Sequence, residues 1–404
     1  MRIGILTYYR VANFGANLQA ASTYHYLKNQ GHTPIMLNYV SEQFEEIINK
    51  GCNQNSQFKE HIEFVDKTIK NQVKSLHTSG DVRRAIKEHN IEAVIIGSDA
   101  VLQHHPLLER IKRGKRKPFY VEKVDPDRMY PSPYWGVGFN RLVPTALMSV
   151  SSQDSQFKYF SKDLKHRMLD TLLPMRYISA RDEWTKKMIN AIGVNDEIPI
   201  TPDPVFGFNY NMGELIESKE QICRRYGLPE HYVLVSLHSQ CLSKSFLHNL
   251  NEQARILNKS CVSLPMPTGI MFESDFDYKI STPLSPLEWY GLIKYADAYI
   301  GSNMHPIVVA LHNAVPCFAI DIWGTRNFWG IPSHNNSSKV KDILSQFGLR
   351  DNISPVINGL CNVSVEEIIS ALKLFPVQEV KEHSKRMYKK YNTMMENILF
   401  SVSR

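Results

Sequence analysis

The sequence has few cysteines and no long apolar run. Its six cysteines lie far apart, and no two of them form the CxxC spacing of a metal or redox site. We therefore expect reduced core thiols in a cytoplasmic protein. No run of about 18 apolar residues occurs, and the first residues, MRIGILTYYR, have the pattern of a strand rather than of a signal peptide. These absences argue against a disulfide scaffold and against a bilayer-spanning segment.

The chain also lacks internal repeats, low-complexity segments and a strong charge imbalance. Its 47 Lys and Arg against 40 Asp and Glu give a formal net charge of +7, which suits anionic partners without selecting one. The dense basic run at 110–117 has no recognition helix or RNA-binding signature beside it, so we expect no nucleic acid as partner. A solvated loop is the simplest interpretation. Peripheral contact with an anionic membrane, at its inner face, is the alternative that this run and the basic tail leave open.

The chain is too long for one compact core and alternates between strand and helix patterns. Its 404 residues suit two domains. Continuously apolar strands such as EAVIIGSD indicate parallel sheets covered on both faces. The proline-rich segment IPITPDPVFGFN separates two such sets. We predict an α/β protein of two Rossmann-like domains, 1–205 and 206–375, that face a cleft, with a C-terminal helix over 376–404. Residues 103–140 form an irregular insertion in the first domain.

Local signals place individual helices. The segment NFGANLQ is a loop that opens a helix, and Gly31 is a plausible end for it. Ser285 and Glu288 have the spacing of a capping box, with Pro286 at the first helical position. Asp182 is placed to cap the helix that follows a strand.

Ligands of open parallel sheets bind at the carboxyl ends of the strands, and this rule selects the candidate site residues. The first half supplies Tyr8, Asn13, Gly15, Asn17, Gln19, Asp99 and Arg181. The second half supplies His238, Ser302, Asn303, His305 and Arg326. His305 stands out because it lies at a predicted helix start, where the helix dipole lowers the pKa of a histidine and favours anions.

Each of these residues also has an ordinary structural interpretation. The NFGANLQ loop lacks the repeated glycines of a dinucleotide or ATP fingerprint, so neither cofactor is expected. Arg181 suits a surface ion pair, and His305 suits a histidine satisfied within the core. His104 and His105 show no metal-ligand spacing, so we expect no metal.

Several motifs occur together in one order: TYYRVANFGANLQAAST, GSD at 97–99, SARD at 179–182 followed by Asp203-Pro204, SPLEWYGLIKYADAYIGSNMHP and AVPCFAI. This ordered set resembles the polysaccharide pyruvyl transferase family over residues 1 to about 330. Asn303 and Pro306 depart from the Arg and Gly that many members of the family carry there, and 103–140 does not align.

The resemblance implies a GT-B-like fold and a cytoplasmic enzyme of capsule or exopolysaccharide biosynthesis. Phosphoenolpyruvate would be the donor, and a diol on a sugar or lipid-linked oligosaccharide the acceptor. The product would be a pyruvate ketal, formed with no cofactor and no metal. His305 and Arg181 would be catalytic, with His305 as general acid. The donor would lie on Ser302, Asn303, Arg326 and His238, and the acceptor on Tyr8, Asn13, Gly15, Asn17, Gln19 and Asp99.

Two alternatives remain at this point. One is a GT-B glycosyltransferase that uses a nucleotide sugar, and the other is a non-catalytic member of a polysaccharide assembly complex. The sequence does not specify the acceptor sugar, its hydroxyl pair, the ketal stereochemistry or the oligomeric state.

Overall fold

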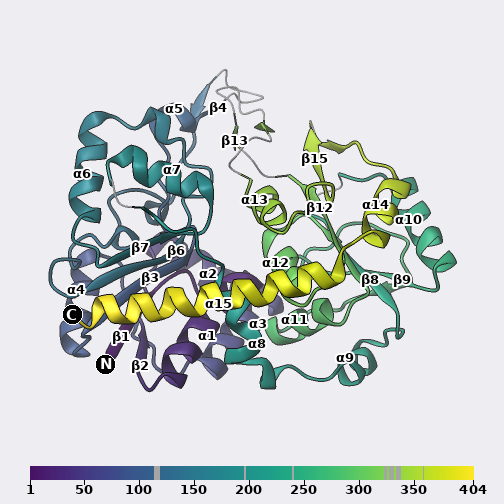
Figure 1. Ribbon diagram of the computed structural model, residues 1–404, viewed down its shortest axis with the longest axis horizontal. Coiled ribbons are helices and arrows are strands. Elements are labelled where there is room, and N and C mark those ends of the chain that lie inside the picture. Colours follow the sequence, from purple (N-terminus) through teal and green to yellow (C-terminus); the bar gives the residue numbers. More distant parts are fainter. Residues whose placement is uncertain are drawn as a thin grey trace.

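Two parallel sheets organise the chain (Figure 1). The computed structural model describes residues 1–112, 119–194, 197–238, 241–322, 325–326, 332–333, 338–357 and 359–404. The first sheet has five parallel strands in the order β2-β1-β3-β6-β7. Their bounds are β1 Arg2–Leu6, β2 Thr33–Met36, β3 Ala93–Asp99, β6 Thr145–Val150 and β7 Tyr177–Ala180.

The second sheet has seven strands in the order β10-β9-β8-β11-β12-β15-β16, all parallel except the last. Their bounds are β8 Tyr232–Ser236, β9 Ser260–Ser263, β10 Tyr278–Lys279, β11 Ala298–Gly301, β12 Cys317–Asp321, β15 Ile353–Ile357 and β16 Leu360–Cys361. Two short antiparallel hairpins lie outside the sheets: β4 Ile111–Lys112 with β5 Tyr120–Val121, and β13 Thr325–Arg326 with β14 Pro332–Ser333.

Helices surround both sheets (Figure 1). In the first half they are α1 Phe14–Asn29, α2 Glu42–Gln54, α3 Ser56–Thr68, α4 Ser79–Glu88, α5 Leu107–Arg110, α6 Lys162–Leu172 and α7 Glu183–Ile192. In the second half they are α8 Phe208–Asn211, α9 Lys219–Tyr226, α10 Lys244–Ile256, α11 Pro286–Lys294, α12 Met304–His312, α13 Lys339–Gln346 and α14 Val365–Lys373. The C-terminal helix is α15 Val377–Val402, which confirms the predicted long helix.

The predicted helix boundaries are confirmed where local capping chemistry sets them. Asn13 caps α1 by accepting a hydrogen bond from the Ala16 N–H, and Gly31 follows the helix with a left-handed φ of +78°. The capping box of Ser285 and Glu288 is present on α11. Asp182 caps α7 through Thr185.

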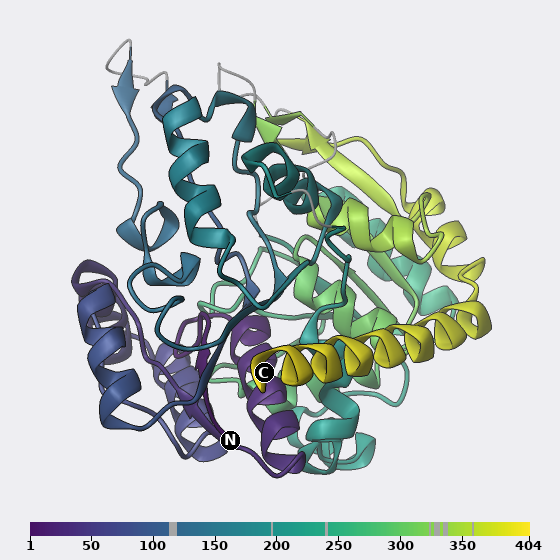
Figure 2. The same cartoon turned by 60° about the vertical axis from the view of Figure 1, so that its left-hand side comes forward.

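A continuous apolar core joins the two halves. Phe14 on α1 stacks on Trp289 of α11, with the ring centroids 4.9 Å apart. The helix α15 runs along both halves (Figures 1 and 2) and packs on α12 as well as on β6 and β7. Its residue Tyr391 is fully buried and contacts Tyr26 of α1 edge-on. The structure thus ties the halves together, while the domain boundaries at 205 and 375 stay a prediction.

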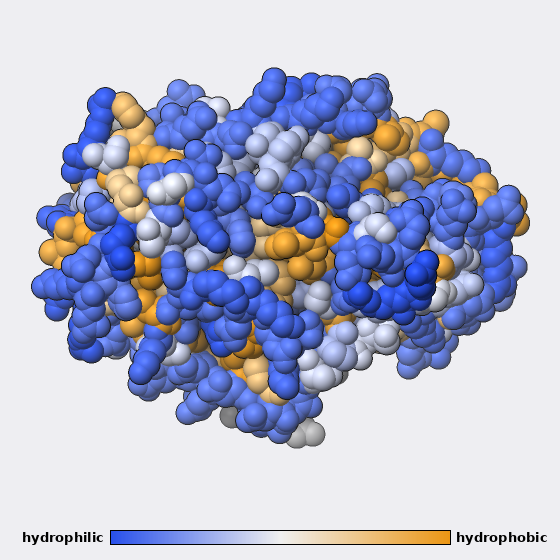
Figure 3. Space-filling view, turned by 90° about the horizontal axis from the view of Figure 1, so that it is seen from below, coloured by the Kyte–Doolittle hydropathy of each residue, from blue (hydrophilic) through white to orange (hydrophobic). Residues whose placement is uncertain are grey.

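The surface seen from below is largely hydrophilic, with apolar residues in separate areas between the hydrophilic ones (Figure 3). No helix in the described ranges is long and apolar enough to cross a bilayer. Most of the basic run at 110–117 lies outside the described residues. The predicted insertion 103–140 contains short helical turns over Pro126–Arg128 and Pro133–Trp135, and the second of these is buried.

Candidate functional site

A cavity of about 670 Å³ opens between the two sheets, and both halves line it. The first half contributes side chains from the ends of β1, β3 and β7, among them Tyr8, Asp99 and Arg181. The second half contributes Asn303 and His305 from the start of α12. This is the cleft at the carboxyl strand ends that the sequence pattern predicts.

His305 sits where the two halves meet. The Gln19 side-chain amide nitrogen on α1 lies 2.7 Å from Nε2 of His305. Because the Gln19 oxygen accepts from the Arg181 guanidinium at 3.4 Å, the amide N–H points to His305 and donates to Nε2. His305 is therefore held as the neutral tautomer that carries its proton on Nδ1. The contact joins α1 of one half to α12 of the other.

Gly15 allows this close packing. A Cβ atom placed on Gly15 would come within 1.9 Å of Cγ of the His305 ring. The sequence analysis assigns Gly15 to the acceptor, and the structure places the catalytic candidate, His305, against it. The missing side chain makes room for the His305 imidazole.

A buried ion-pair group lies beside His305. Arg181 is 5% exposed and donates to Asp203 Oδ2 at 2.9 Å, while Asp99 Oδ1 lies 3.7 Å from its other terminal nitrogen. Asp203 Oδ2 also lies 3.9 Å from Nε2 of His305. The Arg181 Nε atom has no hydrogen-bond partner among the described residues. Arg181 is thus a buried partner of two carboxylates, not the surface ion pair of the simpler interpretation.

The charges of this group shift one another's pKa values. Burial lowers the pKa of His305, and the carboxylates of Asp203 and Asp99 oppose that effect. Burial raises the pKa of Asp99, but its cationic neighbours, Arg181 first among them, bring it below its usual value. Asp99 also has a left-handed φ of 93°, a strained conformation of the kind found at functional sites.

Lys339 is a site residue that the sequence analysis does not identify. It is the first residue of α13, whose cap is Ser338, and it lines the cavity. Burial and the charge of Arg181 lower the pKa of Lys339 to about 8. Within the described ranges no hydrogen bond or ion pair engages its ammonium group. A lysine far along the chain from every quoted motif gives no signal before the fold is known.

The 103–140 segment supplies another wall of the cavity. Asp125 and Asp127 both line it, and Asp127 is 3% exposed. The backbone N–H of Ser41 donates to Asp127 Oδ2, and the Ser41 hydroxyl donates to Asp125. Burial raises the pKa of Asp127 to about 6. No quoted motif includes these carboxylates, because the segment does not align with the family pattern.

The predicted acceptor residues divide into two groups. Tyr8, Asn13, Gly15 and Asp99 line the cavity. Asn17 and Gln19 do not, because both are buried and face protein groups. Asn17 donates to the Val11 carbonyl at 2.8 Å and so holds the loop before α1. In this structure both side chains bind protein groups, and their contact with a sugar stays a prediction.

The predicted donor residues also separate. Asn303 lines the cavity, whereas Ser302 is 1% exposed, lies outside the lining and has no partner for its hydroxyl among the described residues. His238 follows β8 at the same sheet edge, is exposed and does not line this cavity, so its role in donor binding stays a prediction. The backbone of Arg326 lies in β13, and its side chain lies outside the described part of the structure.

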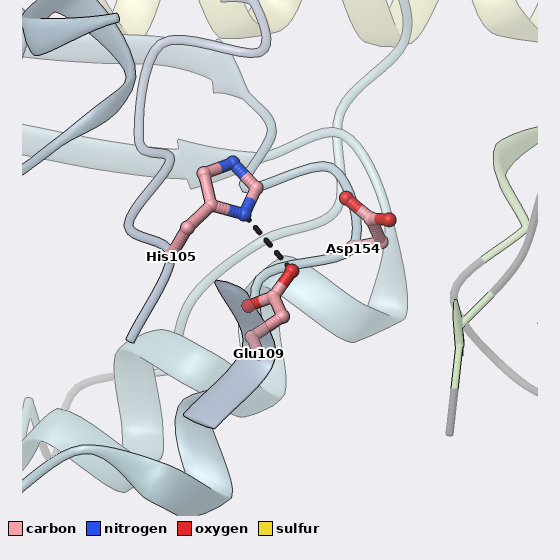
Figure 4. A group of neighbouring side chains, drawn as sticks. All are labelled: His105, Glu109 and Asp154. Carbon is pink, nitrogen blue, oxygen red and sulfur yellow. Dashed lines mark hydrogen bonds and ion pairs between the residues drawn. The ribbon is translucent and has the colours of Figure 1, made fainter. Parts of the chain in front are cut away.

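One group of described residues has the composition of a metal site: His105, Glu109 and Asp154, shown in Figure 4. Their ligand atoms all lie within 4.8 Å of one another. Asp154 also lines the central cavity.

Comparison with known proteins finds one matching family and several solved structures of similar fold. The profile of the polysaccharide pyruvyl transferase family matches residues 13–324. A search of curated proteins finds no match. Among solved structures, the UDP-GlcNAc 2-epimerase from Neisseria meningitidis bound to UDP-GlcNAc superposes with a TM-score of 0.56 at 10% identity, covering 99% of this chain and 100% of that one.

Two further UDP-GlcNAc 2-epimerases give similar values. One superposes with a TM-score of 0.52 at 11% identity, covering 99% of this chain and 95% of that one. The enzyme from Methanocaldococcus jannaschii has a TM-score of 0.50 at 12% identity, covering 93% and 92%. At such low identity the likeness shows the fold alone, and that fold is GT-B.

Proposed function

The chain belongs to the polysaccharide pyruvyl transferase family, and from this membership we propose that it transfers the pyruvyl group of phosphoenolpyruvate to a sugar diol. The product would be a pyruvate ketal on a surface polysaccharide or on its lipid-linked precursor. The observation that supports this proposal best is the position of His305. It lies on the wall of the cavity, at the junction of the halves, beside the buried Arg181–Asp203 pair.

Phosphoenolpyruvate requires cations and a proton donor. Its carboxylate and phosphate together carry a charge of about −3 at neutral pH. Lys339 provides an ammonium group on the cavity wall that is not engaged by any described carboxylate, and α12 begins at the same wall. Arg181 is already held by Asp203 and Asp99, so its main effect would be to fix these carboxylates and Gln19 around His305.

The reaction balances with acid–base chemistry alone. His305, once protonated, would give a proton to the methylene carbon of phosphoenolpyruvate, and the first sugar hydroxyl would add to the neighbouring carbon. The bond from that carbon to the phosphate oxygen then breaks, and phosphate leaves with the electron pair. The second hydroxyl closes the ketal. Of the two hydroxyl protons, one replaces the proton that His305 gave, and the other leaves on phosphate.

The acceptor would enter from the wall formed by the first half. Tyr8, Asn13, Asp99, Asp125 and Asp127 all line this side of the cavity. Carboxylates and amides are suitable partners for a sugar diol, since a sugar hydroxyl both donates and accepts hydrogen bonds. Asp127, whose pKa is raised, would be suited to accept a proton from a sugar hydroxyl.

The first experiment measures ligand-induced stabilisation of the full chain. A ligand that binds the folded state raises the melting temperature. We expect phosphoenolpyruvate to stabilise the wild type and to stabilise His305→Gln less. His248→Gln is the matched control, because His248 is an exposed histidine on α10 in the second half. Release of phosphate on addition of a sugar acceptor then tests the reaction itself.

A panel of nucleotide sugars is measured alongside, because nucleotide-sugar enzymes share the fold. Stabilisation by a nucleotide sugar and not by phosphoenolpyruvate would overturn the proposal in favour of a glycosyltransferase. No stabilisation by either, and no phosphate release with any acceptor, would favour a non-catalytic role. We propose a cytoplasmic location, with peripheral membrane contact tested by flotation with anionic liposomes.

A further inference from the structure

Two loops of the first half meet at the edge of the central cavity. The loop after β3 carries His105 and leads into Glu109, and the loop after β6 carries Asp154. In Figure 4 the two carboxylates and the imidazole lie near a common point. Their ligand atoms lie within 4.8 Å of one another. The sequence analysis expects no metal, because His104 and His105 show no metal-ligand spacing.

A residue outside this group, Gln103, determines which ring nitrogen of His105 carries a proton. Gln103 is 2% exposed, and its side-chain N–H₂ donates to the Ala100 carbonyl at 2.6 Å. That bond fixes the amide, so its oxygen is the atom that lies 3.2 Å from Nε2 of His105. An amide oxygen only accepts, so Nε2 carries a proton. The remaining ring nitrogen, Nδ1, then faces Glu109.

The contact between Nδ1 and Glu109 needs a positive species. The Glu109 Oε1 atom lies 2.9 Å from Nδ1 of His105. A carboxylate oxygen only accepts, and Nδ1 of a neutral ring with a protonated Nε2 offers only a lone pair. Either a second proton or a cation must therefore lie between them. A metal-bound histidine usually donates a hydrogen bond from its other ring nitrogen to a nearby acceptor, as Nε2 of His105 does to Gln103.

The spacing suits a divalent cation. Bonds of about 2.1 Å at angles of 90–110° put neighbouring ligand atoms about 3.0–3.4 Å apart. The 2.9 Å separation of His105 and Glu109 is close to that range. The other Glu109 oxygen accepts from the backbone N–H of Gln156 at 3.3 Å, which orients Oε1 toward His105. The ligand atom of Asp154 lies within 4.8 Å of both.

The His166–Asp170 pair, also among the described residues, lacks these features. His166 and Asp170 have the same sequence separation of four residues, with the ligand atoms 3.8 Å apart, but their side chains are 74% and 54% exposed. The side chains of His105 and Glu109 are both 14% exposed. Among the described residues, His105, Glu109 and Asp154 are the one group in which three potential ligands converge.

We propose that His105, Glu109 and Asp154 bind a divalent transition-metal cation, of the Mn²⁺ to Zn²⁺ class, at the edge of the central cavity. One imidazole and two carboxylates form a mixed nitrogen and oxygen donor set that favours these ions over Mg²⁺. Three protein ligands leave coordination positions for water, or for an anionic oxygen of a ligand in the cavity. Binding of the ion itself does not depend on the proposed pyruvyl transfer.

The test measures the binding of Mn²⁺ to the full chain after treatment with chelator. Electron paramagnetic resonance gives the concentration of free Mn²⁺ at each point of the titration. We expect one saturable Mn²⁺ per chain, displaced by Zn²⁺. Asp154→Asn should weaken binding at least tenfold, because it removes one of three ligands and leaves the His105–Glu109 pair in place. His166→Gln is the matched control and should bind as the wild type does.

Glu109→Gln is the second variant, in case Asp154→Asn does not fold. Melting curves without metal establish that each variant is folded. The proposal is overturned if the wild type binds no Mn²⁺ saturably, or if binding survives unchanged in folded Asp154→Asn or Glu109→Gln. Because the assay contains no phosphoenolpyruvate, a negative result here leaves the proposed pyruvyl transfer to its own experiment.

Discussion

Replacing Gly15 by alanine should displace His305 and with it the proposed activity. The added Cβ would lie 1.9 Å from the ring, about 1.5 Å short of ordinary van der Waals contact. Neither neighbour moves freely, because Gly15 is part of α1 and Nε2 of His305 is held at 2.7 Å by Gln19. The imidazole must therefore shift by about 1 Å or more, which breaks the Gln19 contact.

Two effects of opposite sign contribute to the stability of Gly15→Ala. Alanine in place of glycine inside a helix gains about 0.5–1 kcal/mol when nothing collides. Overpacking of a filled site costs about 1–3 kcal/mol. We expect Gly15→Ala to lower the free energy of unfolding by about 1–2 kcal/mol. Misplacement of a catalytic group by about 1 Å lowers the rate roughly 100-fold.

Gly80→Ala is the control, since Gly80 lies in the first turn of α4 and its added Cβ meets no atom closer than 3.4 Å. Urea unfolding gives the stabilities, and phosphate release from phosphoenolpyruvate gives the rates. If Gly15→Ala had the same stability and the same rate as Gly80→Ala, the reasoning would be refuted. The position of His305 would then not depend on the absence of a side chain at Gly15.

Three further predictions concern the charges around His305. Asp203→Asn should lower the free energy of unfolding by about 3 kcal/mol in urea titrations, because Arg181 stays buried with only the more distant Asp99; restoration of part of the loss by a second change, Arg181→Met, would identify the unpaired charge as the cause. The affinity for phosphoenolpyruvate, measured by calorimetry, should fall as the pH rises through about 8, where Lys339 loses its proton. Lys339→Met should bind phosphoenolpyruvate more weakly and lose this pH dependence. Lys341→Met, at an exposed position on the same helix, should keep it. Asp127→Asn should flatten the pH dependence of stability between about pH 4 and 6. The pKa of Asp127 is raised to about 6 in the folded state, so its contribution to stability is complete below the unfolded pKa and is lost as the pH rises through the folded pKa. Urea titrations of the variant that keep the wild-type slope across this range would contradict the assignment.

The sequence predicts the parts of the fold that depend on neighbours in the chain. The capping box at Ser285, the start of α1 at Asn13 and the long C-terminal helix all follow from short-range chemistry, and all are present. The same reasoning finds His305, because its turn is a strand–helix junction with unusual residues. The strand-end rule then brings His305 together with Asp99 and Arg181 on one cavity.

The remaining site residues depend on contacts that no local pattern encodes. Lys339 begins a helix after a stretch without a regular pattern, and its burial beside Arg181 exists only once α13 has packed against the first half. Asp127 lies in the irregular 103–140 segment. Conversely, Asn17 lies in the first turn of α1 at a suitable strand end, yet its amide holds the preceding loop through Val11. Position at a strand end selects candidates, and the hydrogen-bond partner decides whether a side chain is free to meet a ligand.

The charge of the site links donor binding to protonation of His305. Four charged groups determine its pKa besides burial: Asp203 and Asp99 carry two negative charges, and Arg181 and Lys339 carry two positive ones, so their sum is zero. In this balance burial dominates, and His305 is neutral with Nε2 accepting from Gln19. Entry of a ligand with about three negative charges upsets the balance and favours the imidazolium. The carboxylate of Asp203, whose Oδ2 lies 3.9 Å from Nε2, favours the charged form of the ring. The proposed acid would therefore acquire its proton when the donor arrives, and calorimetry in buffers of different ionisation enthalpy should register proton uptake that His305→Gln abolishes.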